Sequence, residues 1–168
     1  MTAIVRTVPE FDALPTGTLI VAVEYRTAGP HVFAIRSLWQ NVGRGWVNLD
    51  PSDPDDGETT QPAVFLQNLL TGFDSHGVTH GVARVLGAGR DITEADAAQL
   101  AIGSYVATGD GPWTSDVFRH EGDGRWTLMD PTDPDNGDIP YTTAQMGSYN
   151  GGRLRLLYTP GDEGLRPS

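Results

Sequence analysis

The sequence of 168 residues contains no cysteine and no lysine. Without cysteine, a chain has no disulfide, thiolate metal site, iron–sulfur cluster or thiol nucleophile. No apolar run approaches the roughly 20 residues that cross a bilayer. The first fifteen residues also lack the basic end and apolar stretch of a signal peptide. We therefore expect a soluble protein that is made and kept inside a cell.

Acidic residues outnumber basic ones by 22 to 11, which gives a formal net charge of −11. Nine of these acids fall in two short segments, five in residues 50–58 and four in residues 130–138. A negatively charged chain repels nucleic-acid phosphates and anionic membranes, and no long run of arginine offsets this repulsion. We therefore expect neither nucleic acid nor a membrane as a partner.

The same two segments reveal an internal repeat. GWVNLDPSDPDDGE at 45–58 matches RWTLMDPTDPDNGD at 125–138, with Trp46 aligned on Trp126. A repeat of about eighty residues is too long for a solenoid unit and indicates two copies of a small domain. The predicted organisation is a first copy over 1–82, a second copy over 83–160 and a flexible tail over 161–168.

Each copy has the same order of predicted elements. Thr7 and Thr93 each stand three residues before an acid, which is typical of a helix start. Apolar strands, a glycine-containing hairpin turn, a helix and a closing strand follow. The predicted fold class is α+β, as two tandem α-β-β-β-α-β units packed with pseudo-twofold symmetry. The predicted strands are 18–25, 32–38, 46–49 and 82–87, then 104–107, 116–120, 126–129 and 153–158, and the helices before the closing strands are 62–71 and 142–148.

Two stretches, EFDALPTGTLIVA and DVFRHEGDGRWTLMD, combine a short helix, a glycine turn into a strand, and a tryptophan strand after a second glycine turn. This pattern resembles a small β-rich module, of unassigned function, common in proteins of bacteriophages that infect actinobacteria. The resemblance implies a fold and a phage origin, but no established reaction and no catalytic residues. It is approximate, since Ala101 replaces Pro15 in the second copy. The residues that fit the pattern are Leu14, Pro15, Gly17, Thr18, Phe118, Gly122, Asp123, Gly124 and Trp126.

The two acidic segments carry enough carboxylates for a hard cation such as Ca²⁺. The EF-hand pattern is absent, because with Gly57 as the loop glycine its first and third ligand positions fall on Ser52 and Pro54. Asp-Pro and Asp-Asn-Gly are also ordinary turn formers. We expect structural turns, with a Ca²⁺ site or an acidic docking surface as alternatives and no other cofactor. The candidate metal ligands are Asp50, Asp53, Asp55, Asp56, Asp130, Asp133 and Asp135.

Two histidines, His76 and His80, have the spacing of a helical zinc site. Gly77 and the β-branched residues after it disfavour a helix there. The stretch around them has no counterpart in the second copy, so we predict a loop insertion and keep both histidines as candidates for partner contact.

The four tryptophans fall into two groups. Trp46 and Trp126 recur at equivalent positions, which predicts a shared role in the core. Trp39 and Trp113 have no tryptophan counterpart, and we expect them to be exposed anchors in a protein interface.

Motifs for catalysis are missing from the sequence. It has neither the Gly-x-Ser-x-Gly elbow of a serine hydrolase nor the phosphate loop of a nucleotide-binding protein. We therefore predict a non-enzymatic, phage-encoded binding protein that docks on a host or phage protein in the host cytoplasm, such as an inhibitor of host defence or of another host process. The alternatives are a virion accessory or decoration protein, and a protein that binds Ca²⁺ or a small ligand through the Asp-Pro segments or the seam between copies.

Overall fold

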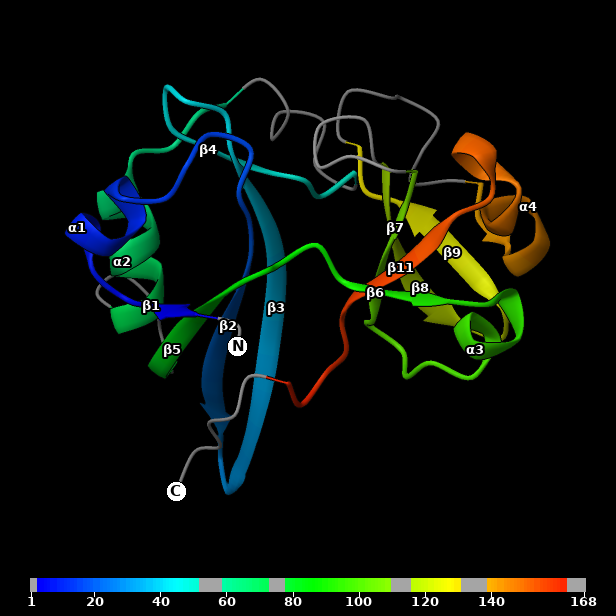
Figure 1. Cartoon of the computed structure of the whole chain (residues 1–168). Coiled ribbons are helices and arrows are strands. Elements are labelled where there is room, and N and C mark those ends of the chain that lie inside the picture. Colours follow the sequence, from blue (N-terminus) through cyan, green and yellow to red (C-terminus); the bar gives the residue numbers. More distant parts are fainter. Residues whose placement is uncertain (1–2, 52–58, 73–77, 110–115, 131–138, 163–168) are drawn as a thin grey trace. The chain divides into compact units, whose positions relative to one another are not determined.

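The computed structural model describes residues 3–51, 59–72, 78–109, 116–130 and 139–162. In this part the protein is mixed α and β, mostly strands, with two antiparallel sheets and four short α-helices (Figure 1). The chain divides into two compact units. Of the described residues, the first unit contains 3–49, 59–72 and 78–86, and the second contains 50–51, 87–109, 116–130 and 139–162. The division falls after Leu86, just beyond the end of the strand Val78–Val85.

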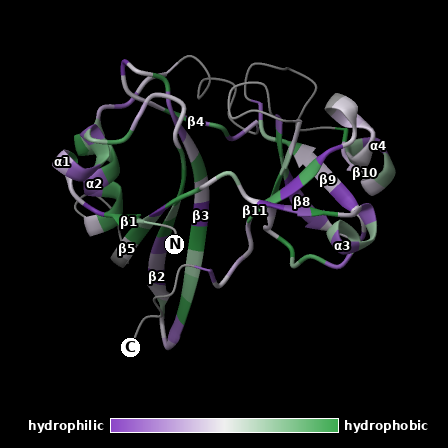
Figure 2. Cartoon of the chain, in the orientation of Figure 1, coloured by the Kyte–Doolittle hydropathy of each residue, from purple (hydrophilic) through white to green (hydrophobic). Residues whose placement is uncertain are grey.

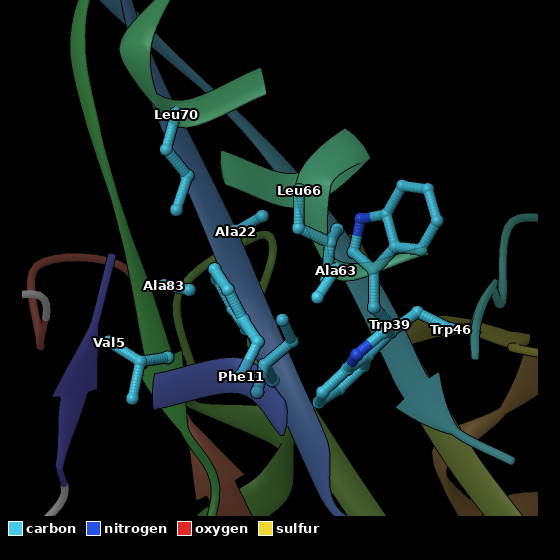
Figure 3. Packing of buried hydrophobic residues seen from close by; sticks show 10 residues of the cluster. Val5, Phe11, Ala22, Trp39, Trp46, Ala63, Leu66, Leu70 and Ala83 are labelled. Carbon is cyan, nitrogen blue, oxygen red and sulfur yellow. The ribbon is translucent and has the colours of Figure 1, made fainter. Parts of the chain in front are cut away.

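The first unit contains a five-stranded antiparallel sheet and two helices. In spatial order the strands are β1 (Ile4–Val5), β5 (Val78–Val85), β2 (Leu19–Ala28), β3 (His31–Asn41) and β4 (Trp46–Asn48), and the helices are α1 (Val8–Asp12) and α2 (Ala63–Thr71). The core lies between the helices and one face of the sheet (Figure 3). In it, Phe11 of α1 meets Trp46 edge to face at 5.8 Å, and Leu66 of α2 is fully buried.

The second unit contains a six-stranded antiparallel sheet. In spatial order its strands are β10 (Tyr141–Thr142), β9 (Arg125–Leu128), β8 (Asp116–Gly122), β7 (Tyr105–Thr108), β11 (Leu154–Tyr158) and β6 (Arg90–Ile92), and its helical elements are α3 (Glu94–Ala98), α4 (Thr143–Gly147) and the 3₁₀ turn Tyr149–Gly151. Phe118, Trp126 and Met146 are fully buried in its core. The shared core role predicted for Trp46 and Trp126 is therefore confirmed.

Both predicted helix starts are confirmed. The Glu10 carboxylate accepts hydrogen bonds from the backbone N–H groups of Arg6 and Thr7, at 2.8 and 2.9 Å. In the second unit, Asp96 accepts from the backbone N–H of Thr93 at 3.0 Å, and the Thr93 hydroxyl accepts from the backbone N–H of Asp96 at 3.1 Å. These backbone hydrogen bonds hold the pKa of both carboxyls below their ordinary values.

The turn from the first helix into the sheet has the same geometry in both units. Gly17 and Gly103 have φ of +91° and +90°, a region that favours glycine. The Gly17 N–H donates to the Asn41 carbonyl at 2.7 Å, and the Gly103 N–H donates to the His120 carbonyl at 2.8 Å. Each of these two glycines therefore ties the end of a helix to the end of a hairpin strand.

The strands fall close to their predicted positions, with two differences. The short strands β1, β6 and β10 were not predicted, because two or three residues carry no periodicity. The closing strand of the first unit begins at Val78, so residues 78–80 are part of β5 and not of a loop insertion; its backbone pairs His80 with Tyr25.

No helix in the described ranges is both long and apolar enough to span a bilayer.

Candidate functional site

The structure places Trp39 in the core of the first unit, so the prediction that it is exposed is wrong. Its relative exposure is 5%, its ring lies 5.7 Å from that of Phe65, and its Nε1 donates to the Ser37 hydroxyl at 2.8 Å. Trp39 is buried because it lies on the sheet face that the helices cover. Trp113 and His76 fall outside the described residues.

Of the predicted metal ligands, the structure describes Asp50 and Asp130. Each lies two residues beyond a strand, β4 and β9 respectively, and each is half-buried. The candidates Asp53, Asp55, Asp56, Asp133 and Asp135 lie outside the described residues. Within the described ranges, no three His, Asp or Glu side chains form a group that could hold a metal ion.

A different feature stands out on the first unit, an exposed apolar stretch of β3. Val32, Phe33 and Ile35 have relative exposures of 47, 45 and 37%, and Figure 2 colours much of β3 as hydrophobic. We call these three residues the β3 edge surface. Large apolar side chains grouped on the surface of an acidic, otherwise polar chain are typical of a protein interaction site.

The β3 edge surface lies where the sheet ends. β2 pairs with β3 along its full length, from Leu19↔Gln40 to Ala28↔His31. On the other side of β3, β4 pairs only with the last three residues of the strand. Among the described strands, none adjoins residues 31–35 on that outer side.

Helix α2 carries a second pair of exposed apolar side chains, near the other end of β3. Phe33 and Ile35 lie on the same sheet face as Trp39, because alternate residues of a strand share a face. Phe65 of α2, 38% exposed, contacts Trp39 on that face, and the neighbouring Val64 is 47% exposed. A partner that lies on this face therefore meets both a strand and a helix.

Sequence reasoning predicted the strand but missed its exposure. The run Val32-Phe33-Ala34-Ile35 is apolar at four successive positions, whereas a strand with one buried face alternates apolar and polar residues. This apolar run, directly after a two-residue turn, was the signal in the sequence that could have indicated an exposed apolar strand. It could equally have indicated a strand buried on both faces.

The second unit carries a depression of about 320 Å³. Four of its lining residues belong to β8 and β9. The lining residues are Asp50, Pro51, Arg119, Glu121, Arg125, Thr127 and Pro140.

Opposite charges balance inside this depression. The Arg119 Nε donates to Glu121 at 2.7 Å. Burial opposes the charged form of Arg119, but the hydrogen bond and charge of Glu121, with Tyr105 and Asp50 nearby, raise its pKa overall. Burial also raises the pKa of Tyr105. The two arginines and two carboxylates that line the depression suit a polar or zwitterionic group better than a strongly charged ion.

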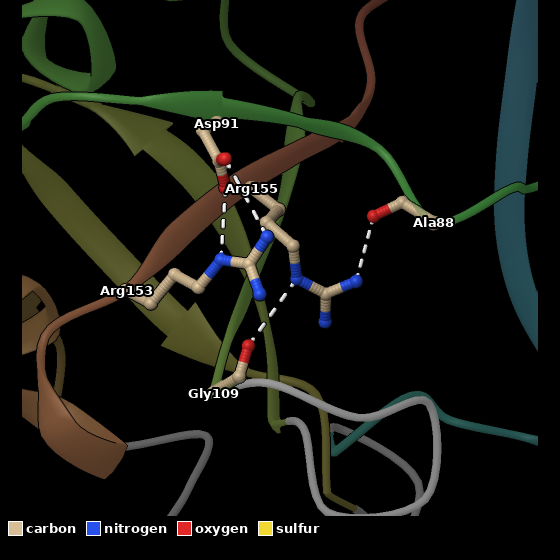
Figure 4. Close-up of polar contacts among 5 residues, drawn as sticks. All are labelled: Ala88, Asp91, Gly109, Arg153 and Arg155. Atoms are coloured by element: carbon tan, nitrogen blue, oxygen red, sulfur yellow. Dashed lines mark hydrogen bonds and ion pairs between the residues drawn. The ribbon is translucent and has the colours of Figure 1, made fainter.

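Two further arginines hold the edge of the second sheet together (Figure 4). Arg155 is buried, and it donates to the carbonyls of Gly109 at 3.2 Å and Ala88 at 2.6 Å. Arg153 pairs with Asp91 at 2.9 Å and lowers the pKa of that carboxyl. Both arginines therefore have structural partners that join β11 to β6 and to the end of β7.

Comparison with protein-family models, with curated proteins and with solved structures finds no match for this chain.

Proposed function

We propose that this chain is a non-enzymatic, phage-encoded binding protein, and that it docks on a host or phage protein through the β3 edge surface. The observation that carries the proposal is the exposure of Val32, Phe33 and Ile35 on a sheet edge. Burying a large apolar side chain contributes about 1.5–3 kcal/mol. Phe33 and Ile35 share one face of the hairpin and together form a suitable anchor for a protein partner.

The neighbouring residues support a protein partner over a small ligand. Phe65 and Val64 of α2 are also exposed, so two elements of the first unit offer apolar side chains to a partner. The depression of the second unit is open and charge-balanced and offers no comparable apolar area. Small-molecule sites are concave and mostly apolar, which favours protein docking as the function of this chain.

We further propose that the two units are copies of one module. The strand after the first helix lies between its hairpin partner and the closing strand in each sheet. Trp46 bridges to Gln61, and Trp126 pairs with Tyr141, so the element after each acidic segment adds to the sheet at the same place. The pseudo-twofold packing of the copies stays a prediction.

Affinity capture with the full-length chain tests the docking proposal. The tagged protein is incubated with lysate of phage-infected actinobacteria, and bound proteins are identified by mass spectrometry. We expect one stoichiometric partner with the wild type, lost with Phe33→Asp because a charge then lies in the apolar contact. Circular dichroism establishes that the variant is folded.

Ile102→Asp is the matched control. Ile102 is 67% exposed and belongs to the second unit, so this variant makes the same chemical change away from the β3 edge surface. It should retain the partner. Equal recovery of the partner by Phe33→Asp and by the wild type would contradict the proposal.

A further inference from the structure

We propose that the outer edge of β3 pairs with the same edge of a second copy of this chain, in an antiparallel ladder centred on Ala34. The inference goes beyond docking on a different protein. Phe33 and Ile35 would contribute side-chain contacts to both events, but only pairing needs the outward backbone groups of Ala34. The two events can therefore be tested separately.

The backbone groups of β3 point alternately toward β2 and toward the outer edge of the sheet. In an antiparallel ladder, successive residues direct their N–H and C=O groups alternately to one side and the other. The Leu38 carbonyl accepts from the Leu49 N–H at 2.9 Å, on the side away from β2. The same alternation directs the backbone groups of Val32 and Ala34 outward, where the described ranges place no strand.

The central residues of this edge lack the usual protection against pairing with another strand. Natural edge strands carry charged side chains, prolines or bulges that prevent the addition of another strand. Residues 31–35 contain no acid, lysine, arginine or proline, in a chain with 22 acidic residues, and Pro30 and Arg36 flank this stretch. The β2–β3 register also runs without a bulge from end to end, so the edge is regular and open to a ladder.

The outer edge of β3 is complementary to itself. In a ladder centred on Ala34, Phe33 of each copy faces Ile35 of the other copy, on the same face of the joined sheet. These would be non-hydrogen-bonded pairs, in which opposite side chains approach most closely. Aromatic and β-branched residues form favourable cross-strand pairs. Arg36 would face Val32 of the other copy, so no like charges oppose each other.

Symmetry limits the assembly to two copies. A twofold contact uses the same edge of both molecules, so a dimer closes and no filament grows. A ladder of a few residues buries less than the roughly 1,200 Å² of a stable interface. We therefore expect reversible dimers with a dissociation constant on the order of micromolar.

Sedimentation equilibrium of the full chain, from about 1 to about 100 μM, tests the inference over the expected range. The wild type should change from monomer to dimer. Ala34→Pro should stay monomeric, because it removes an outward N–H and leaves the β2–β3 hydrogen bonds intact. Ala34→Lys should weaken association about tenfold or more, because two lysines then face each other at the twofold axis.

If Ala34→Pro distorts β3, loss of the dimer in that variant would not identify the contact, and a mixture of two other variants then provides the test. Ala34→Lys and Ala34→Glu should each be mainly monomeric alone and should form a heterodimer when mixed, because opposite charges then meet at the centre of the ladder. Ala34→Ser should behave like the wild type. A wild-type monomer at every concentration, or a dimer unaffected by the proline and lysine variants, would overturn the inference. In that case the docking proposal would still be supported if Phe33→Asp failed to capture the partner that the wild type binds.

Discussion

His120 illustrates how a single side chain can be buried without its hydrogen bonds. Its relative exposure is 4%, and its ring lies 4.6 Å from that of Trp126. Neither ring nitrogen has a hydrogen-bond partner among the described residues. A buried polar group without a partner costs about 1–3 kcal/mol. The aromatic contact with Trp126 offsets part of this cost.

We predict that His120→Phe stabilises the protein by about 1 kcal/mol, because it keeps the aromatic contact and removes two buried polar atoms. Urea unfolding measures the change in the free energy of unfolding. His31→Phe, at an exposed position, is the control and should leave the stability nearly unchanged. A clear loss of stability in His120→Phe would indicate that the nitrogens do have partners.

Asp91 contributes to the dependence of stability on acid through one ion pair, in addition to the capping carboxyls Glu10 and Asp96. Arg153 donates to Asp91 and lowers the pKa of that carboxyl below its ordinary value. The folded state then holds this proton less tightly than the unfolded state. The resulting stabilisation is present above the ordinary pKa and is lost as the pH falls through the folded-state pKa.

We therefore predict that Asp91→Asn flattens the decrease in melting temperature between pH about 5 and about 2.5. Thermal melts over that range compare the variant with the wild type. Arg153→Gln should flatten the same curve, since it removes the cause of the shift. If the melting temperature of both variants fell with pH as it does in the wild type, other carboxyls would cause the loss of stability in acid.

At the scale of elements, the turns that lead from α1 to β2 and from α3 to β7 depend on glycine. Gly103 has φ of +90°, and a Cβ there would lie 3.2 Å from Pro160. Gly87 lacks a positive φ, and a Cβ there would meet nothing within 4 Å. The two glycines therefore offer a matched pair for testing the role of backbone conformation.

We predict that Gly103→Ala costs about 1–2 kcal/mol of stability, because a side chain at this φ is strained. Gly87→Ala should be neutral or slightly stabilising, since it only restricts the unfolded chain. Chemical denaturation of both variants checks the difference. Equal stabilities would show that the turn at Gly103 relaxes to another conformation.

The elements also show what the sequence could and could not reveal. Local signals are strong where chemistry is local: the Thr–acid pairs mark both helix starts, and the recurring tryptophans mark both cores. Exposure is a property of the folded chain. Trp39 is buried because α2, more than twenty residues later, covers it, and Phe33 is exposed because no described strand adjoins it. Neither the burial of Trp39 nor the exposure of Phe33 can be read from the few residues on either side of it.

At the scale of the whole molecule, net charge governs how copies approach each other. Each chain carries a formal charge of −11, so two copies repel at long range. Salt screens this repulsion, with a Debye length of about 10 Å at 0.1 M and about 3 Å at 1 M. Backbone hydrogen bonds and apolar contacts at the β3 edge are far less sensitive to salt.

We predict that dimers become tighter, not weaker, when NaCl rises from about 20 mM to about 500 mM. Sedimentation equilibrium at both salt concentrations measures the change. Association that weakens with salt would indicate that ion pairs between copies drive it, and the contact would then lie elsewhere on the surface.

The two-residue turn between β2 and β3 has a practical consequence. Gly29 has φ of +60°, and nothing lies within 4 Å of the position of its missing Cβ. Because the chain has no cysteine, an Ala28→Cys substitution beside this turn would give the molecule its sole thiol. A spin label or fluorophore attached there would report distances from the hairpin tip in any complex the protein forms.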